Sequence, residues 1–493
     1  MKLKELMGSI EHEEIYANPN LEIRGLSYDS RQVRPGDLLF TWSGITFDGH
    51  DYLDEARQRG AVGAVVEKPV LQLKGFTQLV VKDPRTIMGL IAKRFYHNVD
   101  EKMTLIGVTG TNGKTTVSSL LYYIFNACAR PCGLFSTINH LIGERVIPAG
   151  RTTPEALDIY RMLDEMHRSG IRHAVVEVSS HALDLGRLEG LRFSAGVFTN
   201  LSHDHLDFHM TMERYFEAKS YLFQLLDQNG IAVINRDDPY GMRLLKTLKP
   251  EQVIDFGLTE ASKIFAKDIT FSQRSTTFTL CFPGGTISVK TCLIGQFNVY
   301  NILAAFAVVW GLKCSGEGIL EAIGSFHTVL GRMQRVDLTD RFSVFVDYAH
   351  TPDAMKNVLE SLAVYKRAQL VVVFGCGGDR DKAKRVPMGE MAGLLADRVI
   401  ITSDNPRTED PEAIMNTIEK GVKKTKTNYC KKRERRDAIN YALSILGEGD
   451  ILLVAGKGHE KFQELMGRML PFDDEAVIRD CYNAHRKQET GKR

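Results

Sequence analysis

The sequence predicts an α/β protein of three domains with mostly parallel sheets. A chain of 493 residues is longer than one hydrophobic core usually accommodates. Short apolar runs alternate with helical patterns through the middle and the last third of the chain. Strands that alternate with helices indicate parallel sheets covered on both faces. A glycine-rich segment also stands between an apolar run and a helical pattern near residue 110.

Changes in pattern divide the chain into three predicted domains. The first, residues 1–98, has short strands with turn signals between them, and the second, residues 99–331, alternates strands and helices. A hairpin-like stretch near residues 263–294 interrupts this alternation before a helix at 301–312. The third, residues 332–493, alternates again and is predicted to be Rossmann-like. The expected strands are 61–66, 78–81, 103–108, 173–178, 195–199, 231–234, 342–347, 369–374, 398–402 and 451–455.

The composition is that of an ordinary soluble globular protein. Hydrophobic residues make up 43% of the chain and charged residues 25%, with a formal net charge of +2, so bulk charge gives no reason to expect a nucleic acid or a membrane surface. The N-terminal stretch lacks the apolar segment of a signal peptide, and no apolar run approaches the ~18 residues of a membrane span. We therefore expect a cytoplasmic chain without membrane insertion, whose eight scattered cysteines are reduced.

One stretch of the chain is locally basic. It comprises Lys423-Lys424-Thr425-Lys426 and Lys431-Lys432-Arg433-Glu434-Arg435-Arg436. Because it has one tyrosine and no stacking pattern, we interpret it as a solvated connection and not as a nucleic-acid surface.

The most specific local signal is Val108-Thr109-Gly110-Thr111-Asn112-Gly113-Lys114-Thr115-Thr116. A predicted strand precedes it and a helical run follows, so its backbone N–H groups would surround a phosphate at a helix N-terminus. In such a loop Lys114 pairs with the β- and γ-phosphates of ATP, and Thr115 offers its hydroxyl to Mg2+. Val108 replaces the first glycine of the usual motif, and the alternative is a tight turn with an exposed lysine. The context favours a central P-loop ATPase domain.

The form Thr109-Gly110-Thr111-Asn112-Gly113-Lys114 resembles the ATP site of the Mur ligases and the folylpolyglutamate synthetases, which are ATP-dependent amide-forming enzymes. Further segments resemble the muramyl-tripeptide synthetases of the Mur ligase family, namely 177–183, 200–209, 216–219, 295–301 and 346–352. The resemblance covers nearly the whole chain in the same order. It implies nucleotide contacts from Asn298, Arg332 and Asp347, with His350 in the same region.

Besides Lys114, three residues are candidates for catalysis. From the residues alone, Glu177 ends a predicted buried strand, where a carboxylate either serves Mg2+ or faces solvent. The histidines and aspartates of 203–209 could suggest zinc, but no cysteine lies nearby. Lys219, on a predicted helix at 213–226, is typical of a surface lysine.

The resemblance implies different roles for these three residues. It implies that Glu177, with Thr115, holds Mg2+ and that His205 stands beside a second Mg2+. It also implies that Lys219 carries CO2 as a carbamate, which supplies oxygen ligands to the metal. A carbamate forms only on a neutral amine, and a partly buried site near a metal favours that form.

The resemblance implies that the acid substrate is UDP-N-acetylmuramoyl-L-alanyl-D-glutamate. Ser30 matches the uridine-nucleotide contact, and the positions that hold the muramyl and peptide parts are matched by Thr152, Thr153, Ser179 and Arg187. Leu185 stands where some relatives place a polar contact. From the residues alone, Thr153 before Pro154 would cap a helix N-terminus, and both roles are compatible.

The segment Ser403-Asp404-Asn405-Pro406-Arg407 follows a predicted strand directly. Ligands bind at the carboxyl ends of parallel strands, and Pro406 extends Asn405 and so fixes the position of Arg407. A guanidinium pairs with a carboxylate, which favours meso-2,6-diaminopimelate over L-lysine. The resemblance adds Arg380, Asp404, Asn405, Gly456 and Glu460 as contacts to diaminopimelate. The alternative is an Asn-Pro turn with a surface arginine.

The predicted reaction is ATP-dependent amide formation through an acyl phosphate. An L-lysine-adding muramyl ligase and a folylpolyglutamate synthetase are the alternatives from the same chemistry, although Asp29-Ser30-Arg31 favours a UDP-linked substrate. A P-loop GTPase or kinase would not need a separate amino-acid-binding domain, and a nucleotide-regulated binding protein would not need Lys219. We expect a monomer that binds ATP, Mg2+ and the two substrates, and no nucleic acid.

Overall fold

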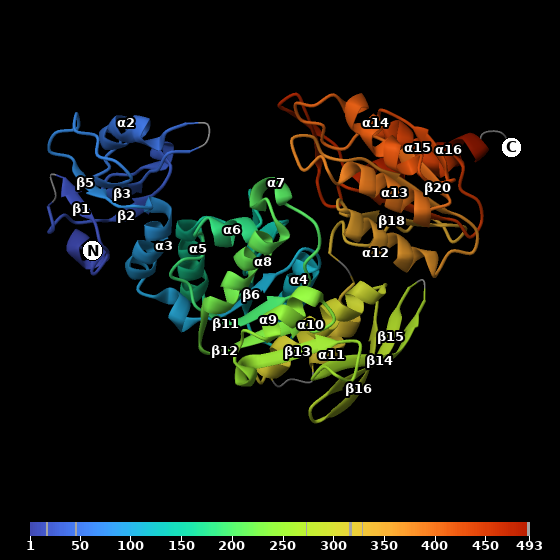
Figure 1. The fold of residues 1–493 in the computed structure, drawn as a ribbon, viewed down its shortest axis with the longest axis horizontal. Helices are drawn as coiled ribbons and strands as arrows, with labels where there is room; N and C mark the ends of the chain where they lie inside the picture. The colour runs from blue at the N-terminus through green and yellow to red at the C-terminus, as the bar shows by residue number, and fades with distance from the viewer. Residues whose placement is uncertain (16–17, 45–46, 273, 315–317, 328, 491–493) are drawn as a thin grey trace. The chain divides into compact units, whose positions relative to one another are not determined.

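The computed structural model describes residues 1–15, 18–44, 47–272, 274–314, 318–327 and 329–490. The chain divides into two compact units, whose helices and strands are labelled in Figure 1. Unit 1 consists of residues 1–109, 125–197 and 218–232, and unit 2 consists of residues 110–124, 198–217 and 233–493. Both units contain parts of the predicted central domain, so the proposed boundaries after residues 98 and 331 stay a prediction.

The N-terminal part of unit 1 is a five-stranded sheet in the order β1-β5-β4-β3-β2. Only β1 runs antiparallel to its neighbour. Asp83 caps α3 through the backbone N–H groups of Arg85 and Thr86, and Pro84 occupies the first turn. The elements are α1 (Leu3–Met7), β1 (Glu13–Ile15), β2 (Gly25–Ser27), β3 (Asp37–Phe40), α2 (Leu53–Gln58), β4 (Gly63–Val66), β5 (Thr77–Val80) and α3 (Pro84–Phe95).

The second sheet of unit 1 contains the run β11-β6-β10-β7-β8-β9. Strand β10 is parallel to both β6 and β7, and its register places Glu177 opposite Val108 at the carboxyl ends of the two strands. Strands β8 and β9 add an antiparallel edge. The elements are β6 (Thr104–Thr109), β7 (Cys132–Phe135), β8 (Asn139–Ile142), β9 (Arg145–Pro148), α5 (Ala156–Arg168), β10 (His173–Glu177), α6 (Ser180–Asp184) and β11 (Phe193–Phe198).

Four elements contain residues of both units: α4 (Lys114–Ala127), β11 (Phe193–Phe198), α8 (Met212–Ser220) and β12 (Leu226–Asn235). The helix predicted at 213–226 is longer than the observed helix α8. It ends at Ser220 because a 3-10 turn, Tyr221–Gln224, follows, and the chain then enters β12.

Four strands of unit 2 form the run β13-β14-β15-β16. The hairpin expected near residues 263–294 is a meander, because β15 pairs antiparallel with both β14 and β16. Helix α10 starts earlier than predicted, since its first turn is built from Gln296, Phe297 and Asn298. The elements are α7 (Leu206–His209), α9 (Pro239–Leu245), β13 (Val253–Gly257), β14 (Ile264–Phe271), β15 (Thr276–Phe282), β16 (Gly285–Thr291), α10 (Gln296–Gly311) and α11 (Gly318–Ser325).

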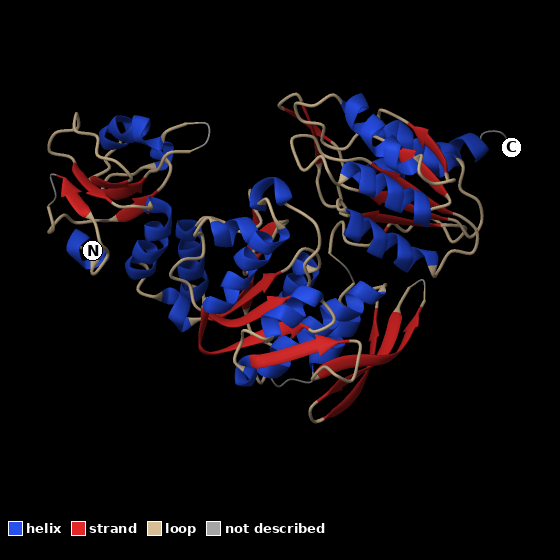
Figure 2. Cartoon of the chain, in the orientation of Figure 1, coloured by secondary structure: helices blue, strands red, loops and turns tan. Residues whose placement is uncertain are grey.

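The C-terminal part of unit 2 is a six-stranded sheet in the order β17-β18-β22-β19-β20-β21, with helices and strands in alternation along the chain (Figure 2). All neighbours except β17 and β18 are parallel. The strands are β17 (Gln334–Arg335), β18 (Ser343–Asp347), β19 (Leu370–Phe374), β20 (Arg398–Ile401), β21 (Asn428–Lys431) and β22 (Ile451–Ala455), and the helices are α12 (Pro352–Ala363), α13 (Arg385–Leu395), α14 (Pro411–Val422), α15 (Arg435–Ser444) and α16 (Asp474–Thr490).

Each central strand of this sheet contributes to two cores. On β19, Leu370, Val372 and Phe374 pack with residues of α12, α13 and α14, whereas Val371 and Val373 pack with residues of α15 and α16. Burial on both faces explains why the strand is apolar at every position. The same arrangement places the carboxyl ends of β18, β22, β19 and β20 at one edge of the sheet.

The basic stretch 423–436 is not a solvated connection throughout. Asn428–Lys431 forms the edge strand β21, and the Arg435 side chain is fully buried, where it pairs with Asp474.

A hairpin, β23 (Phe462–Leu465) and β24 (Arg468–Pro471), follows β22. Among the described residues, no helix is long and apolar enough to cross a membrane.

Candidate active site

The phosphate loop of unit 2 has the geometry that its glycines predict. Gly110 and Gly113 adopt φ values of +145° and +87°, which glycine adopts without steric cost. A Cβ atom on Gly110 would lie 1.8 Å from Thr199 Oγ1, so no larger residue fits there. Lys114 is the first residue of α4. The loop therefore ends at a helix N-terminus, as an anion site requires.

Asn200 holds the loop in this conformation. Its main-chain carbonyl accepts a hydrogen bond from Thr111 N (2.9 Å), and its side-chain Oδ1 accepts one from Asn112 N (2.9 Å). Its Nδ2 donates to the Asn112 carbonyl (3.1 Å). Asn200 was not among the predicted site residues, because its importance depends on a contact 88 positions away.

Lys114 and Thr115 contact groups close to the loop. Lys114 Nζ donates to the carbonyls of Gly110 and Thr111, both at 2.9 Å. Thr115 Oγ1 accepts a hydrogen bond from Arg332 Nη2 (3.2 Å), and the Arg332 guanidinium lies 4.6 Å from the centre of the Tyr348 ring. The structure thus brings Arg332, a predicted nucleotide contact, to the predicted Mg2+ ligand Thr115.

Asn298 and Asp347 occupy buried positions in the same unit. Asn298 Oδ1 accepts from Asn301 Nδ2 (3.0 Å), and Asn301 Oδ1 lies next to the Cα of Gly113. Asp347 ends β18 and accepts from the N–H groups of Met333 (2.6 Å) and Ala349 (2.7 Å). Burial raises the pKa of Asp347, although nearby Arg332 and these two donors act against the increase.

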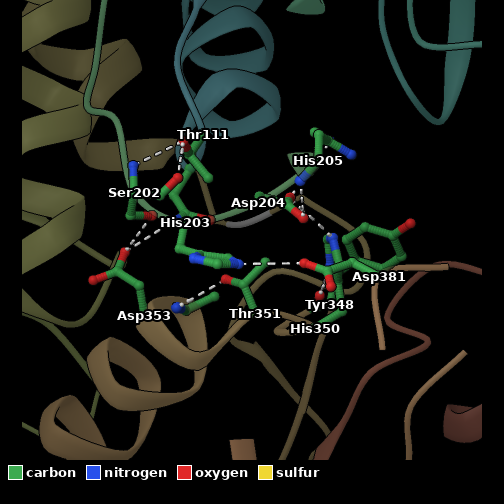
Figure 3. Close-up of polar contacts among 12 residues, drawn as sticks. Thr111, Ser202, His203, Asp204, His205, Tyr348, His350, Thr351, Asp353 and Asp381 are labelled. Atoms are coloured by element: carbon green, nitrogen blue, oxygen red, sulfur yellow. Dashed lines mark hydrogen bonds and ion pairs between the residues drawn. The ribbon is translucent and has the colours of Figure 1, made fainter. Parts of the chain in front are cut away.

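A cluster of histidines and aspartates lies beside the loop (Figure 3). Asp204 Oδ2 is 3.4 Å from His205 Nε2 and 3.9 Å from His350 Nε2. Burial would raise the pKa of Asp204, but His205, His350 and Lys384 together lower it to about 2. Burial and Lys384 lower the pKa of His350 to about 4, against the opposite effect of Asp204. Asp204 is therefore an anion at neutral pH.

Asp353 connects this region to the loop. Its Oδ2 accepts a hydrogen bond from Asn112 Nδ2 (2.9 Å). The same oxygen accepts one from Ser202 Oγ (3.2 Å) (Figure 3). In the sequence it follows Pro352 at the start of a helix, where an acidic residue is common for electrostatic reasons alone. No local signal separates its contact with the loop from that ordinary role.

In unit 1, Glu177 is fully buried and not solvent-facing. Its Oε1 accepts from Thr137 N (3.0 Å) and its Oε2 from Thr137 Oγ1 (2.9 Å). Thr137 Oγ1 also lies 3.2 Å from Thr152 Oγ1. Thr137 therefore connects Thr152, a predicted substrate contact, with the predicted metal ligand Glu177.

Thr153, Ser179 and Arg187 form a connected group. Thr153 Oγ1 donates to the Glu177 carbonyl (2.6 Å) and accepts from Ser179 N (3.0 Å). Arg187 Nη1 donates to the Thr153 carbonyl (3.1 Å), and Arg187 Nε is 3.2 Å from Glu155 Oε1. Burial lowers the pKa of Arg187 to about 10, despite Glu155. The predicted capping role of Thr153 is wrong, because α5 begins at Ala156 with Glu155 at the capping position.

Ser30 belongs to a 3-10 turn, Ser30–Gln32, that Asp29 caps through Arg31 N (3.0 Å). Among the described residues, the hydrogen bonds do not connect Ser30 with Thr152, Thr153, Ser179 or Arg187. Its assignment to the uridine nucleotide stays a prediction.

The remaining predicted metal residues differ in exposure. Lys219, on α8, is 1% exposed, so it is not a surface lysine. The His205 side chain is 43% exposed, and its backbone adopts the left-handed region with φ +53°. Thr115 and His205 belong to unit 2, whereas Glu177 and Lys219 belong to unit 1. Across the described ranges, no group of three or more His, Cys, Asp and Glu side chains gathers as a metal site.

The Asp404–Arg407 turn follows β20 at the carboxyl edge of the C-terminal sheet. Arg407 has φ +53°, which the sequence did not predict. Its Nε donates to Glu464 Oε2 (3.0 Å), and its Nη1 donates to the Gly378 carbonyl (2.6 Å). A Cβ atom on Gly377 would meet Arg407 Nη1 at 3.0 Å and Arg380 Cγ at 3.8 Å. The two predicted arginines therefore flank the same glycine.

Lys457 organises the rest of the predicted amino-acid site. It is fully buried, and its Nζ donates to Asn405 Oδ1 (3.1 Å) and Glu460 Oε2 (3.3 Å). Asn405 Nδ2 also donates to Glu460 Oε2 (2.7 Å). Burial and Asp404 raise the pKa of Glu460, and Lys457 acts against them. Lys457 was not predicted, although it stands between the predicted Gly456 and Glu460.

Asp404 and Gly456 are in contact, because a Cβ atom on Gly456 would lie 2.5 Å from Asp404 Oδ2. Arg435 Nη1 approaches the same oxygen at 3.8 Å, and Arg435 is anchored to Asp474 through Nε and Nη2 (both 2.7 Å). The structure thus brings Asp404, Asn405, Gly456 and Glu460 together, with Arg380 and Arg407 at the adjacent glycine.

Comparison with protein families gives three successive matches along the chain. Residues 22–96 match "Mur ligase family, catalytic domain", residues 108–309 match "Mur ligase middle domain", and residues 331–458 match "Mur ligase, glutamate ligase domain".

Individual proteins are similar over almost their whole length. The UDP-N-acetylmuramoyl-L-alanyl-D-glutamate--2,6-diaminopimelate ligase of Caldanaerobacter subterraneus subsp. tengcongensis is 42% identical over 480 residues, which cover 97% of this chain and 98% of the relative. The ligase of the same name from Geobacter metallireducens is 43% identical over 499 residues, with the same coverage.

Solved structures agree with this relationship. A structure of a ligase with the same name has 34% sequence identity and a TM-score of 0.70, with 99% of both chains covered. The MurF ligase from Thermotoga maritima in complex with ADP has a TM-score of 0.66 over 95% of this chain and 99% of its own, and its 21% identity supports the fold alone. The predicted α/β, three-domain fold class is confirmed, and the chain belongs to the Mur ligase family of ATP-dependent ligases.

Proposed function

We propose that this chain joins meso-2,6-diaminopimelate to UDP-N-acetylmuramoyl-L-alanyl-D-glutamate in peptidoglycan precursor synthesis, with conversion of ATP to ADP and phosphate. Relatives at about 40% identity over nearly the full chain carry the corresponding name. The observation that carries the choice of amino acid is Arg407, whose guanidinium is held at the carboxyl edge of the C-terminal sheet with its Nη2 unbonded among the described residues.

The reaction proceeds in two steps. The carboxylate of the D-glutamyl residue attacks the γ-phosphorus of ATP, so that ADP leaves and an acyl phosphate forms. A neutral amino group of diaminopimelate then attacks the acyl carbon, phosphate leaves, and the amine loses a proton. In the first step Lys114 turns from the carbonyls of Gly110 and Thr111 to the γ-phosphate, where its charge stabilises the transition state.

The donor set fits Mg2+, which prefers oxygen ligands and few carboxylates. The Thr115 hydroxyl and the Glu177 carboxylate, each buried, are oxygen ligands suited to Mg2+. A carbamate on Lys219 would add further oxygen ligands, and His205 would add a nitrogen ligand. Burial disfavours a charged amine in general, so the buried position of Lys219 supports its reaction with CO2. Bound Mg2+ would neutralise the phosphate charge during transfer.

Selection of the amino acid follows from charge. The far end of meso-diaminopimelate carries a carboxylate, which pairs with a guanidinium, whereas L-lysine ends in an ammonium group that Arg407 repels. Arg380 lies beside the same glycine and supplies a second cation. Asp404, Asn405, Gly456 and Glu460 complete the site. Carboxylates do not separate the two amino acids, because both carry ammonium groups, so the choice against L-lysine rests on the cations Arg407 and Arg380.

We also propose that Ser30, Thr152, Thr153, Ser179 and Arg187 bind the UDP-linked substrate. The Thr153–Ser179–Arg187 group supports this, because it places hydroxyl groups and a guanidinium beside the end of β10. We place the enzyme in the cytoplasm, where ATP is available, and expect a monomer because one chain supplies every proposed site residue.

The test is phosphate release by the purified chain with the UDP-linked dipeptide, ATP and either meso-diaminopimelate or L-lysine. We expect the wild type to use diaminopimelate and largely to refuse lysine. A lost charged hydrogen-bond pair costs ~1.5–3 kcal/mol, so Arg407→Ala should raise the KM for diaminopimelate about tenfold or more. A preference of the wild type for lysine, or an unchanged KM in the variant, would refute the assignment.

A further inference from the structure

The β23–β24 hairpin is fastened to the Asp404–Arg407 turn through its main chain. Arg407 N donates to the Glu464 carbonyl (3.0 Å), and Met466 N donates to the Arg407 carbonyl (2.7 Å). Glu464 N donates to Asn405 Oδ1 (3.0 Å). Glu464 is thus held at both its N–H and its C=O. These two bonds fix the backbone position from which the Glu464 side chain extends towards Arg407.

The Arg407–Glu464 ion pair uses only part of each side chain. Arg407 bonds through Nε and Nη1, and Glu464 accepts through Oε2. Within the described part of the chain, Arg407 Nη2 and Glu464 Oε1 make no hydrogen bond. The two side chains are 20% and 31% exposed. The pair therefore offers one cationic donor and one anionic acceptor next to each other.

Other carboxylates of the site are already engaged. Glu460 Oε2 accepts from both Asn405 and Lys457, and Asp404 faces the buried Arg435. Their side chains are 19% and 9% exposed, less than that of Glu464. Of these three carboxylates, Glu464 is the most exposed and is the one paired with Arg407.

We propose that Glu464 is a specificity-determining residue, which binds the distal ammonium group of meso-diaminopimelate while Arg407 binds the carboxylate on the same carbon. This inference rests on the proposed function. An amino-acid end carries both charges on one carbon, so an adjacent guanidinium and carboxylate are complementary to it. Arg407 alone would recognise only the carboxylate. With Glu464 the site distinguishes diaminopimelate from a diacid that lacks the distal amine.

The test compares Glu464→Gln with the wild type on two substrates. One is meso-diaminopimelate, and the other is L-2-aminopimelate, which has one amino-acid end and a distal carboxylate but no distal amine. Glutamine keeps an oxygen for Arg407 Nε, so the guanidinium stays in place. We expect the KM for diaminopimelate to rise about tenfold, with the KM for L-2-aminopimelate and for ATP unchanged. Glu390→Gln, which removes a surface pair with Lys424, is the matched control and should change neither KM.

Four results would overturn the inference. An equal rise in KM for both pimelates would show that Glu464 only positions Arg407. A lower KM for diaminopimelate would show that Glu464 competes with the substrate for Arg407, and an unchanged KM would show that it only joins the hairpin to the turn. Absence of phosphate release by the wild type with diaminopimelate would overturn the proposed function as well. This outcome is measured on the wild type alone, without any variant. Melting temperatures of all variants confirm that they are folded.

Discussion

The carboxylate of Asp353 accepts a hydrogen bond from the side chain of Asn112 at 2.9 Å, and this bond joins the start of α12 to the phosphate loop. The same oxygen accepts from Ser202 Oγ at 3.2 Å. Asp353 is therefore part of the framework that shapes the loop, although 241 positions separate it from Asn112.

Asp353→Ala should weaken ATP binding. Loss of the acceptor leaves the Asn112 amide and the Ser202 hydroxyl without this partner, at a cost of ~1–3 kcal/mol. We expect the KM for ATP to rise about tenfold, with the KM for diaminopimelate unchanged. Glu360→Ala on the same helix, whose side chain is 49% exposed, is the control. A similar effect of both substitutions would indicate that α12 as a whole, and not the bond to Asn112, affects ATP binding.

Lys114→Ala should abolish most of the ligase activity in a folded protein. The γ-phosphate loses a positive charge that acts in the transition state, and removal of such a group typically lowers kcat by ~10²-fold or more. Phosphate release measures the loss, and the melting temperature checks the fold. Lys290→Ala, an exposed lysine on β16, should retain wild-type turnover. Turnover of Lys114→Ala close to that of the wild type would refute the phosphate-loop assignment.

Lys219→Ala should be nearly inactive and partly rescued by short carboxylates such as acetate, which replace the carbamate oxygens. A readout independent of activity is the 13C NMR spectrum in 13C-labelled bicarbonate, where the wild type should show a carbamate signal that the variant lacks. Lys246→Ala, at an exposed position, should keep that signal. Absence of a carbamate signal in an active wild type would disprove the modification.

Glu409 should stabilise the folded protein above pH 4.5. Hydrogen bonds from Arg385 lower the pKa of Glu409 from 4.5 to about 2. Because the folded pKa is the lower one, the stabilisation is complete above 4.5 and disappears as the pH falls towards 2. Glu409→Gln should therefore lower the Tm at pH 7 and lower it less at pH 3. An equal loss of Tm at both pH values would mean that charge is not responsible.

The sequence predicted those parts of the fold that have strong local signals. Residues 370–374 and 399–401 are apolar throughout because both faces of their strands are buried, and they lie in β19 and β20. The edge strand β21 was missed because Asn428–Lys431 is largely polar and exposed. The end of α8 was missed because no proline or glycine marks Ser220.

The sequence predicted candidate site residues where they stand together in a motif, as in the phosphate loop and the Asp404–Arg407 turn. It did not predict residues that act through a remote partner. Asn200, Asp353, Lys457 and Glu464 gain their importance from contacts with distant segments or from burial. Arg435 looked like part of a solvated basic run, and only its pairing with Asp474 explains its burial.

Strand order in the C-terminal sheet has a consequence for how the enzyme is made. Strand β22 lies between β18 and β19, yet it is the last of the sheet's strands to leave the ribosome. The sheet cannot be completed between β18 and β19 until residues 451–455 are synthesised. The segment 456–464 follows these residues in the chain. The proposed amino-acid site therefore forms after the other strands of this sheet have been synthesised. A nascent chain that stalls before residue 451 contains the residues of the phosphate loop but lacks Gly456, Lys457 and Glu460 of the proposed amino-acid site.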